Sequence, residues 1–409
     1  MPDPGSSHAL DRAALYLGLA SAAAPLISIA ASQLLLAMAL AALLASRIRL
    51  RWPPIWLPLG LFVLGTLISL AASEDPSAGL PQVRKLFVIA MLPVVFSAVG
   101  ELRQAGRLLL AWIGLAALSG ALGLVQFARR WEEARLVGAS FYEHYVSARI
   151  SGFMSHWMTF GGQMMMAGLL LAAWLMFSGQ ARRGKLLAAL AAAVLIAAAL
   201  VLNMTRSIWL ATAAGCLYLV WFWKRRLLLA VPVLAGALFF VGPESVRTRA
   251  ISIYRPRQEV DSNQHRVVCW RTGWRMIQAH PWLGLGPEMV RLRFTDYLPA
   301  DVAQPLPTGW YGHLHNLYLH YAAERGVATA LALVWLLAQM FWDFTRAARR
   351  ASGEAKYLLH GAAAVVLGAA VSGLFELNLG DSEVLMLFLA VAACGYLALE
   401  KVQEKPPHA

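Results

Sequence analysis

Three histidines, two tyrosines and an asparagine crowd residues 310–320. Because the pKa of histidine lies near neutrality, a histidine here could act as a general base or stabilise a developing charge. His313 and His315 are two residues apart, which suits a strand better than a helix, and no carboxylate or cysteine stands at ligand spacing from them. We therefore favour a base or charge stabiliser over a metal site, with Tyr311 and Asn316 as neighbouring substrate-binding candidates.

Two arginines outside the expected basic loops are the natural partners of this histidine. Arg206 follows the aliphatic run 186–202, and Arg266 opens a segment in which Trp270 and Trp274 recur at helical spacing. A guanidinium offers a planar fork of donors that suits phosphate oxygens. The alternative interpretation is an interfacial arginine and a surface helix that face lipid headgroups. Two cations beside a neutral base suit an anionic leaving group, such as a lipid pyrophosphate, attacked by a hydroxyl.

The elements that position these residues are membrane helices. Hydrophobic residues make up 59% of the 409 and charged residues 14%, with a mean hydropathy of +0.59. Soluble domains are about 45–50% apolar and about 25% charged, so a soluble cytosolic enzyme is excluded. The net charge of +13 indicates basic cytoplasmic loops or an anionic ligand. Nucleic acid is disfavoured as a partner because no basic stretch is interleaved with aromatic residues.

The hydropathy pattern predicts an all-α, polytopic membrane protein. We expect about twelve transmembrane helices, each of about 20 residues, and every second short loop is basic. This alternation puts those loops and both termini in the cytoplasm, and we expect no cleaved signal peptide. The expected span centres lie near residues 20, 38, 63, 91, 118, 169, 194, 213, 234, 330, 366 and 390.

The predicted organisation places two long loops on the other, outer side of the membrane. The second is the larger, and we expect short amphipathic helices in it, one of them starting at residues 261–264. We expect no inverted repeat of the transporter kind. The predicted parts are 1–128 with transmembrane helices 1–5, the loop 129–158, 159–242 with helices 6–9, the large loop 243–314, and 315–409 with helices 10–12 and a cytoplasmic tail.

The residues that follow His315 carry a spacing that resembles the O-antigen ligase and polymerase superfamily. Ligases of this family carry His, then Asn, Ser or Gln, nine residues, Gly, two residues, and Gly, Thr or Tyr. Here the pattern reads His315-Asn316, nine residues, Gly326, two residues and Thr329. The resemblance covers most of residues 140–335 and includes three further segments: Arg149 to Phe153 with His156, Thr205 to Ser207, and Arg266 through Gly286.

The resemblance implies a GT-C-like membrane glycosyltransferase at the periplasmic face of the Gram-negative inner membrane. Such ligases transfer a glycan from undecaprenyl pyrophosphate, the donor, to a sugar hydroxyl of the lipid A core, the acceptor. They invert the anomeric centre and need neither a metal nor a nucleotide, so no cofactor is expected. His315 takes the catalytic position, and Arg206 and Arg266 take the pyrophosphate positions. The remaining substrate-binding candidates are Arg149 and His156, from the weaker upstream motif, and His313, from its proximity to His315.

Three other functions stay open. A polymerase of the same superfamily would join repeat units, and a protein O-oligosaccharyltransferase would glycosylate protein hydroxyls. The clean histidine motif and a chain that ends soon after the last span favour the ligase. A transporter or flippase of lipid-linked glycans would need broken helices and paired acidic residues inside spans. Glu376 is the only candidate for such an acid, and we expect it at the outer boundary with Asp381 and Glu383.

Overall fold

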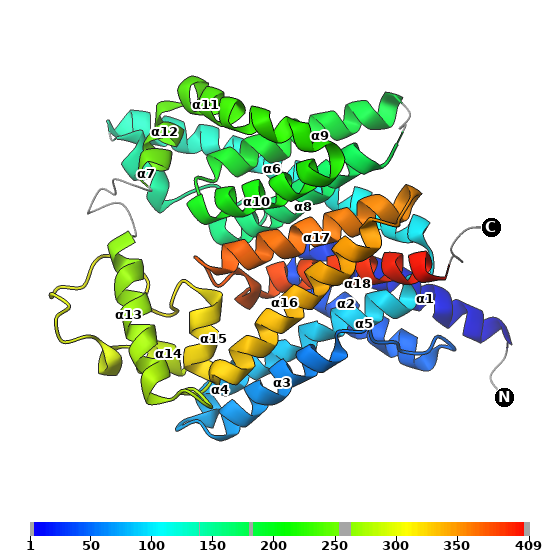
Figure 1. Cartoon of the computed structure of the whole chain (residues 1–409), viewed down its shortest axis with the longest axis horizontal. Helices are drawn as coiled ribbons and strands as arrows, with labels where there is room; N and C mark the ends of the chain where they lie inside the picture. The colour runs from blue at the N-terminus through cyan, green and yellow to red at the C-terminus, as the bar shows by residue number, and fades with distance from the viewer. Residues whose placement is uncertain (1–3, 139, 180–182, 253–262, 405–409) are drawn as a thin grey trace.

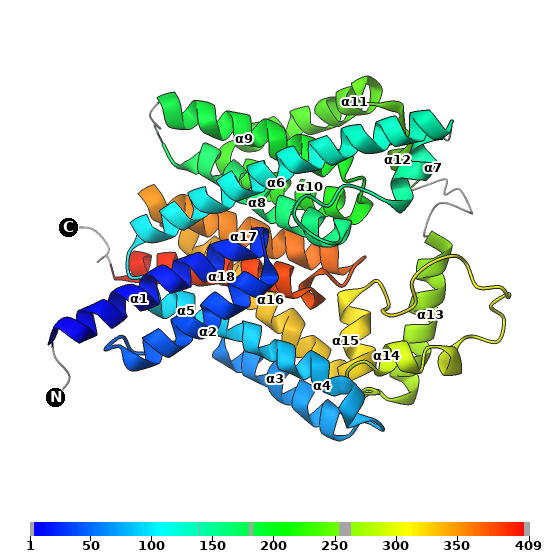
Figure 2. The same cartoon turned by 180° about the vertical axis from the view of Figure 1, so that it is seen from behind.

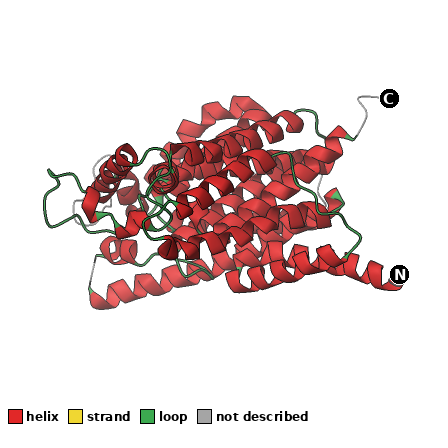
Figure 3. Cartoon of the chain, turned by 90° about the horizontal axis from the view of Figure 1, so that it is seen from below, coloured by secondary structure: helices red, strands yellow, loops and turns green. Residues whose placement is uncertain are grey.

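The computed structural model describes residues 4–138, 140–179, 183–252 and 263–404, and these residues form helices without any strand. The prediction of an all-α fold is confirmed. The helices stack side by side, and loops gather mainly at one end of the stack (Figure 3). The α-helices are α1 (Pro4–Ala23), α2 (Ile29–Ala45), α3 (Trp56–Ala71), α4 (Pro76–Arg84), α5 (Met91–Ala98), α6 (Leu102–Val137), α7 (Phe141–Ser147), α8 (Trp157–Phe177), α9 (Arg183–Leu202), α10 (Arg206–Lys224), α11 (Val231–Val241), α12 (Glu244–Ile251), α13 (Asn263–Ala279), α14 (Met289–Leu292), α15 (Leu317–Arg325), α16 (Val327–Ala348), α17 (Gly353–Gly373) and α18 (Ser382–Gln403). The 3-10 helices are η1 (Ala24–Leu26), η2 (Lys85–Ala90), η3 (Arg225–Ala230), η4 (Thr295–Tyr297) and η5 (Asn378–Gly380).

Seven helices among the described residues are long and apolar enough to cross a membrane, judged by length and composition. Together with the apolar composition, they indicate a membrane protein. Two further helices, α2 and α3, are apolar but have only 17 and 16 residues. The seven are α6, α8, α9, α16, α17, α18 and the segment Pro76–Ala98, which joins α4, η2 and α5.

A helix lies at each of the twelve positions where the sequence predicts the centre of a span. Besides α2 and α3, three of these helices do not qualify by length and composition, namely α1, α10 and α11. The 11 residues of α11 are fewer than the roughly 20 that a hydrocarbon core requires. The count of twelve spans therefore stays a prediction, as does the side of the membrane on which each loop lies.

The first predicted loop begins later than expected because α6 has 36 residues and ends at Val137. Residues 129–137 are therefore helical, and Gly138, with φ of 68°, ends the helix in the left-handed conformation. In the second predicted loop, α12, α13 and α14 are the expected short helices, although Asp261 and Ser262, at the predicted start of α13, lie outside the described residues. The added turns of α6 carry two ion pairs three residues apart, Arg130–Glu133 and Glu132–Arg135.

The centre of the bundle is α17, which packs against α8, α10, α16 and α18 (Figure 1). The apolar windows of α17 and α18 are 78% and 83% buried, whereas that of α9 is 22% buried. Small residues allow the close contacts, since Gly361 and Gly368 of α17 face Leu170 and Leu169 of α8. α9 is therefore peripheral, and α17 and α18 form the rigid support from which the adjoining loops project.

The basic junctions lie at one end of the bundle and the candidate site at the other. Figures 1 and 2 place the α2–α3 junction, the α16–α17 junction and the start of α9 at the end where α1 begins and α18 finishes. α13, α14 and α15 lie at the opposite end. This separation is what the predicted alternation of basic loops requires.

Two segments of the sequence motifs pack backbone to backbone at the end of α15. Val327 N donates to Pro281 O at 2.9 Å, and Leu285 N donates to the carbonyl of Ala323 at 2.9 Å. Gly326 has φ of 81°, and a Cβ built there would overlap the carbonyl of Trp282. The glycine of the motif is thus required by a positive φ and by a close backbone approach.

Replacement of Gly326 by alanine is expected to destabilise the protein, because the methyl group meets a backbone carbonyl that cannot rotate away. We expect a loss of about 1–3 kcal/mol in the free energy of unfolding, the range for a strained backbone conformation. Thermal unfolding in detergent measures this change. Gly100→Ala is the matched control, since nothing lies within 4 Å of a Cβ at that position. Equal melting temperatures for the two variants would contradict the steric argument.

Candidate active site

Glu376, which follows α17, contacts both of the strongest sequence candidates. Its Oε1 accepts a hydrogen bond from the Arg266 guanidinium, and its Oε2 lies 3.2 Å from His315 Nδ1. The Glu376 side chain is only 5% exposed. Burial would raise the pKa of Glu376, but the charge of Arg266 and the contact with His315 hold it below its ordinary value. A buried carboxylate therefore joins the predicted base to a predicted phosphate ligand.

The backbone around His315 fixes the position of its ring. His315 has φ of 48°, in a region that residues with a side chain rarely adopt, and its N–H donates to His313 Nδ1 at 3.2 Å. Asn316 caps α15, because its Oδ1 accepts from Leu319 N at 2.9 Å and its Nδ2 donates to Leu374 O at 3.0 Å. Both ends of the Asn316 amide are thus engaged by backbone.

Both ring nitrogens of His315 face acceptors. Nε2 lies 3.1 Å from the carbonyl oxygen of Trp310, opposite the contact of Nδ1 with Glu376. A neutral imidazole has one N–H and can donate to only one of the two. This arrangement suits an imidazolium that donates to both. A neutral ring with Nδ1–H on Glu376 has its Nε2 lone pair against the Trp310 carbonyl, so this nitrogen can accept a proton only if the carbonyl moves away.

His313 packs against the His315 ring, and Tyr311 packs against His265, which is itself in contact with His315. The His313 ring centroid is 4.1 Å from that of His315. Burial, followed by the charges of neighbouring histidines, lowers the pKa of His313 to about 3, so this ring is neutral at pH 7. The Tyr311 hydroxyl donates to Pro307 O at 2.6 Å, and its ring packs on His265 with centroids 4.5 Å apart. Tyr311 therefore offers its ring, rather than its hydroxyl, to the site.

A group of arginines converges on the turn between α9 and α10. Arg249 Nε donates to Met204 O at 3.0 Å, and Arg149 donates to Met204 O at 3.4 Å and to Thr205 Oγ1 at 3.0 Å. Burial, followed by the charge of Arg249, lowers the pKa of Arg149 to about 9, and the charge of Arg266 contributes. Arg149, Arg249 and Arg266 are therefore close enough for their charges to interact.

Arg206, the first residue of α10, connects this group to α13. Its side chain donates to Ser252 O at 2.9 Å, to Ser252 Oγ at 3.0 Å and to Asn263 Oδ1 at 2.7 Å. Asn263 begins α13 and lies one turn before Arg266. Arg206 is buried, and its hydrogen bonds to Ser252 and Asn263 stabilise the position of α13 relative to α10. A role of Arg206 on pyrophosphate stays a prediction.

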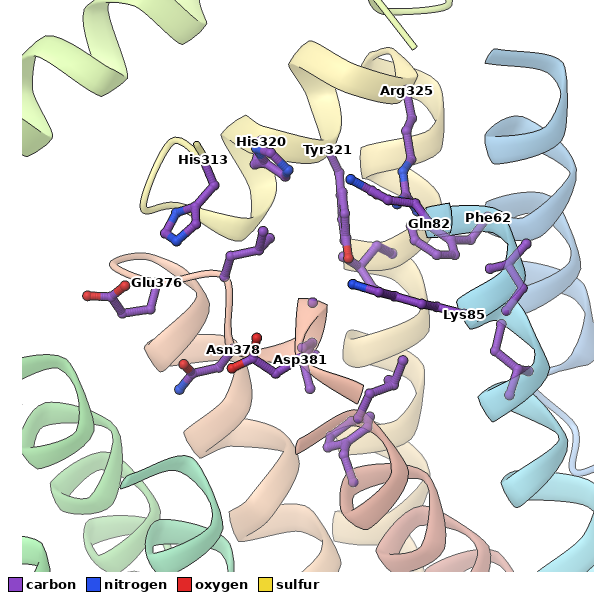
Figure 4. Close-up of a pocket in the computed structure, with 18 of the residues that line it drawn as sticks. Phe62, Gln82, Lys85, His313, His320, Tyr321, Arg325, Glu376, Asn378 and Asp381 are labelled. Atoms are coloured by element: carbon purple, nitrogen blue, oxygen red, sulfur yellow. The ribbon is translucent and has the colours of Figure 1, made fainter. Parts of the chain in front are cut away.

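A cavity of about 530 Å³ opens beside Glu376. In Figure 4 the side chains of His313, Glu376 and Asp381 line one part of it and Lys85 reaches in from the opposite wall, toward Tyr321. Much of the apolar lining comes from two long helices. From α16 these residues are Leu333, Leu336 and Leu337, and from α18 they are Leu385, Phe388 and Leu389. The cavity is therefore amphipathic.

His156 lines the same cavity from the N-terminus of α8. Its Nδ1 accepts from Met158 N at 3.2 Å, and its ring lies 4.2 Å from that of Trp157. Burial, followed by the charge of Arg149, lowers the pKa of His156. The guanidinium of Arg149 lies 4.8 Å from the Trp157 ring. Of the upstream motif, His156 thus reaches the cavity and Arg149 reaches the arginine group.

Lys85 is a cation inside an apolar segment. It belongs to η2, within the candidate span Pro76–Ala98, and it forms no ion pair within the described part of the chain. Burial raises the pKa of Asp381 to about 6, and the charge of Lys85 partly opposes this rise. Ionisable residues at such positions generally serve a substrate or a pathway, so Lys85 is a candidate ligand for an anion in the cavity.

Glu324, near the end of α15, is a second buried acid and lies next to Arg325, which lines the cavity. Its Oε1 accepts from Glu288 N at 2.8 Å, and its Oε2 lies 3.5 Å from His320 Nε2. Arg325, beside it, donates to Thr66 Oγ1 at 3.1 Å. Burial is the largest cause of a pKa of Glu324 raised to about 7, and Arg325 opposes it. This acid is therefore partly protonated at neutral pH.

The raised pKa of Glu324 predicts that stability falls as pH rises from about 4.5 to about 7. In that window the unfolded chain ionises Glu324 freely, whereas the folded chain resists ionisation. Glu324→Gln cannot ionise, so we expect it to remove this slope, worth on the order of 1–3 kcal/mol. Thermal unfolding from pH 4 to pH 8 measures the effect, with exposed Glu132→Gln as control. Parallel pH profiles of wild type and Glu324→Gln would contradict the prediction.

Sequence reasoning missed several members of the site. Glu376 was expected at the outer boundary, but its sequence separations of 61 from His315 and 110 from Arg266 gave no sign that it contacts both. The sequence shows no cysteine at ligand spacing from the histidines of residues 310–320. The fold nevertheless brings Cys269 and His265 beside His315. Arg249 and Lys85 could have been identified from the sequence by one feature, since each is a cation close to an apolar run.

The comparisons with known proteins agree with the motif. A family model described as O-antigen ligase matches residues 191–334. The matched region contains Arg206, Arg266 and His315 and extends through the glycine at the end of α15, whereas Glu376 lies outside it. No curated protein matches the chain.

Proposed function

We propose that this chain, whose match over residues 191–334 supports membership of the O-antigen ligase superfamily, is an O-antigen ligase of the Gram-negative inner membrane. The superfamily implies a membrane glycosyltransferase of the ligase or polymerase type, acting on lipid-linked glycans. The donor is undecaprenyl-pyrophosphate-linked O-antigen, and the acceptor is a sugar hydroxyl of the lipid A core. The end of the bundle that carries α13 and α15 is the periplasmic one, where transfer occurs.

One observation carries the proposal: a buried carboxylate holds a histidine and an arginine together. Glu376 orients His315 through Nδ1 and pairs with Arg266. The Nε of Arg266 is buried without a hydrogen-bond partner among the described residues, so a phosphate oxygen that reaches it would satisfy this donor. A base, its orienting acid and a phosphate ligand are the groups that displacement of a pyrophosphate requires.

The proposed reaction is a single displacement. The acceptor hydroxyl oxygen attacks the anomeric carbon, and its proton passes to His315 Nε2 in place of the contact with the Trp310 carbonyl. The bond from the anomeric carbon to the pyrophosphate oxygen breaks, and its electron pair leaves with undecaprenyl pyrophosphate. Arg266, together with Arg206 and Arg149, stabilises the charge that develops on the leaving group. The new bond forms on the face opposite the leaving group, so the anomeric configuration inverts.

The cavity fits a lipid substrate. Glu376 and His313 belong to its polar lining, and α16 and α18 contribute much of its apolar lining. An amphiphile with a charged head and a prenyl chain matches this lining, and Lys85, which also lines the cavity, supplies a cation. The amphipathic lining thus supports a lipid-linked donor over a water-soluble one.

The test is a transfer assay with the purified full-length chain in detergent. A polyprenyl-pyrophosphate glycan and a lipid A core acceptor in EDTA should yield the joined glycolipid. Omission of the acceptor separates the alternatives, because a polymerase would then lengthen the donor-linked glycan. Transfer to a protein hydroxyl would identify an oligosaccharyltransferase. After reconstitution of the chain into vesicles, donor movement across the membrane without joined product would identify a flippase. Any of these three results would overturn the ligase.

A further inference from the structure

His315 has a second set of neighbours on α13. His265 and Cys269 are four residues apart on this helix and so share one face. His265 is 2% exposed and Cys269 is fully buried. One ligand atom from each of His265, Cys269 and His315 lies within 4.8 Å of the other two. Two imidazoles and a thiol gathered at this distance form the ligand set of a Zn²⁺ site.

The detailed contacts show that the two candidate histidine ligands converge on the Trp310 carbonyl. Cys269 Sγ lies 3.5 Å from His265 Nε2, and the Trp310 carbonyl lies within 2.7 Å of His265 Nε2 and 3.1 Å of His315 Nε2. Both imidazoles thus present Nε2 to one point. Glu376 meets His315 from the opposite side, at Nδ1. A carboxylate behind a histidine, with the other nitrogen free for the metal, is the usual outer shell of zinc sites.

We propose that His265, Cys269 and His315 bind Zn²⁺, and that the bound ion inhibits glycan transfer. Three protein ligands leave one position of the tetrahedron for water or for the Trp310 carbonyl. Coordination replaces the thiol proton of Cys269, which passes to solvent, and the sulfur binds as thiolate. The ion occupies His315 Nε2, the atom assigned to the acceptor proton. The binding half of this proposal is independent of the proposed function, whereas the inhibitory half rests on it.

Cobalt(II) is the probe for binding, because a thiolate ligand gives Co²⁺ a charge-transfer absorption that nitrogen and oxygen ligands do not give. The full chain in detergent, freed of metal by chelation, is titrated with Co²⁺. We expect this absorption to saturate at one Co²⁺ per chain. Cys269→Ala should abolish it, and Cys216→Ala, on α10, should retain it. Glu376→Gln should weaken Co²⁺ binding by about 10–100-fold, as loss of an outer-shell partner does.

Two results would overturn the binding site: no thiolate absorption in the wild type, or the same absorption in Cys269→Ala. Circular dichroism and thermal unfolding verify that each variant is folded. If Cys269→Ala does not fold, His265→Gln replaces it as the ligand variant. Inhibition is measured separately, each variant being referred to its own rate in EDTA. Zn²⁺ should inhibit the wild type at least about tenfold more strongly than Cys269→Ala. Equal inhibition would overturn the regulatory half, while a failure of transfer in the wild type would leave the cobalt result intact.

Discussion

Replacement of His315 by alanine is expected to lower the rate of glycan transfer by about 10²–10⁴-fold, the usual contribution of a general acid–base group. The ring lies between Glu376 and the Trp310 carbonyl, so its loss removes the proton acceptor while the arginines stay in place. Donor affinity should therefore change little. Single-turnover assays with saturating donor and acceptor measure the chemical step, and donor binding is measured separately.

Controls separate chemistry from folding and a base from a fixed charge. His280→Ala is the matched control, since among the described residues the side chain of this exposed histidine has a hydrogen bond only with the Tyr297 hydroxyl, at 2.9 Å. This variant should keep at least half of the activity. His315→Arg retains a positive charge but cannot accept a proton at neutral pH. Recovery of activity in His315→Arg would assign His315 as a charge stabiliser. Full activity in His315→Ala would remove it from the reaction.

The architecture was predictable where the sequence carries a one-dimensional signal. Apolar runs of about 20 residues mark membrane helices, and helices lie at all twelve expected centres. Hydropathy does not predict where a helix ends or where it is interrupted. α6 continues past its apolar part because charged residues at helical spacing extend it, and α11 is shortened by η3 before it. Hydropathy alone does not encode either effect.

The site was only half predictable, for a physical reason. His315 and Arg266 stand out because they lie in segments of unusual composition next to apolar runs. Glu376 looks like any boundary acid until α17 places it beside both, and Cys269 becomes a neighbour of His315 only when α13 packs on α15. Contacts between distant segments depend on helix packing, which a single sequence does not display. The sequence therefore indicated the base, His315, but not its partners Glu376 and Cys269.

Replacement of Arg266 by lysine is expected to raise the KM for the donor by about 10–100-fold with a smaller effect on stability. The guanidinium uses one nitrogen on Glu376 and keeps its buried Nε without a partner among the described residues. Lysine retains the charge beside Glu376 but loses the planar fork. The loss of a hydrogen bond to a charged group, about 1.5–3 kcal/mol, corresponds to that change in KM. Arg266→Ala is less informative, because an unpaired buried carboxylate costs about 3–5 kcal/mol in folding.

The matched control for Arg266→Lys is Arg271→Lys on the same helix. Arg271 pairs with Asp301 at 2.7 Å on the exposed side of α13, where an ion pair contributes little. Arg271→Lys should leave the KM for the donor within about twofold of wild type. Steady-state transfer at saturating acceptor, with the donor varied, measures both variants. If Arg266→Lys keeps the wild-type KM, Arg266 serves only to neutralise Glu376, and the pyrophosphate must bind elsewhere, with Lys85 as the next cation to replace.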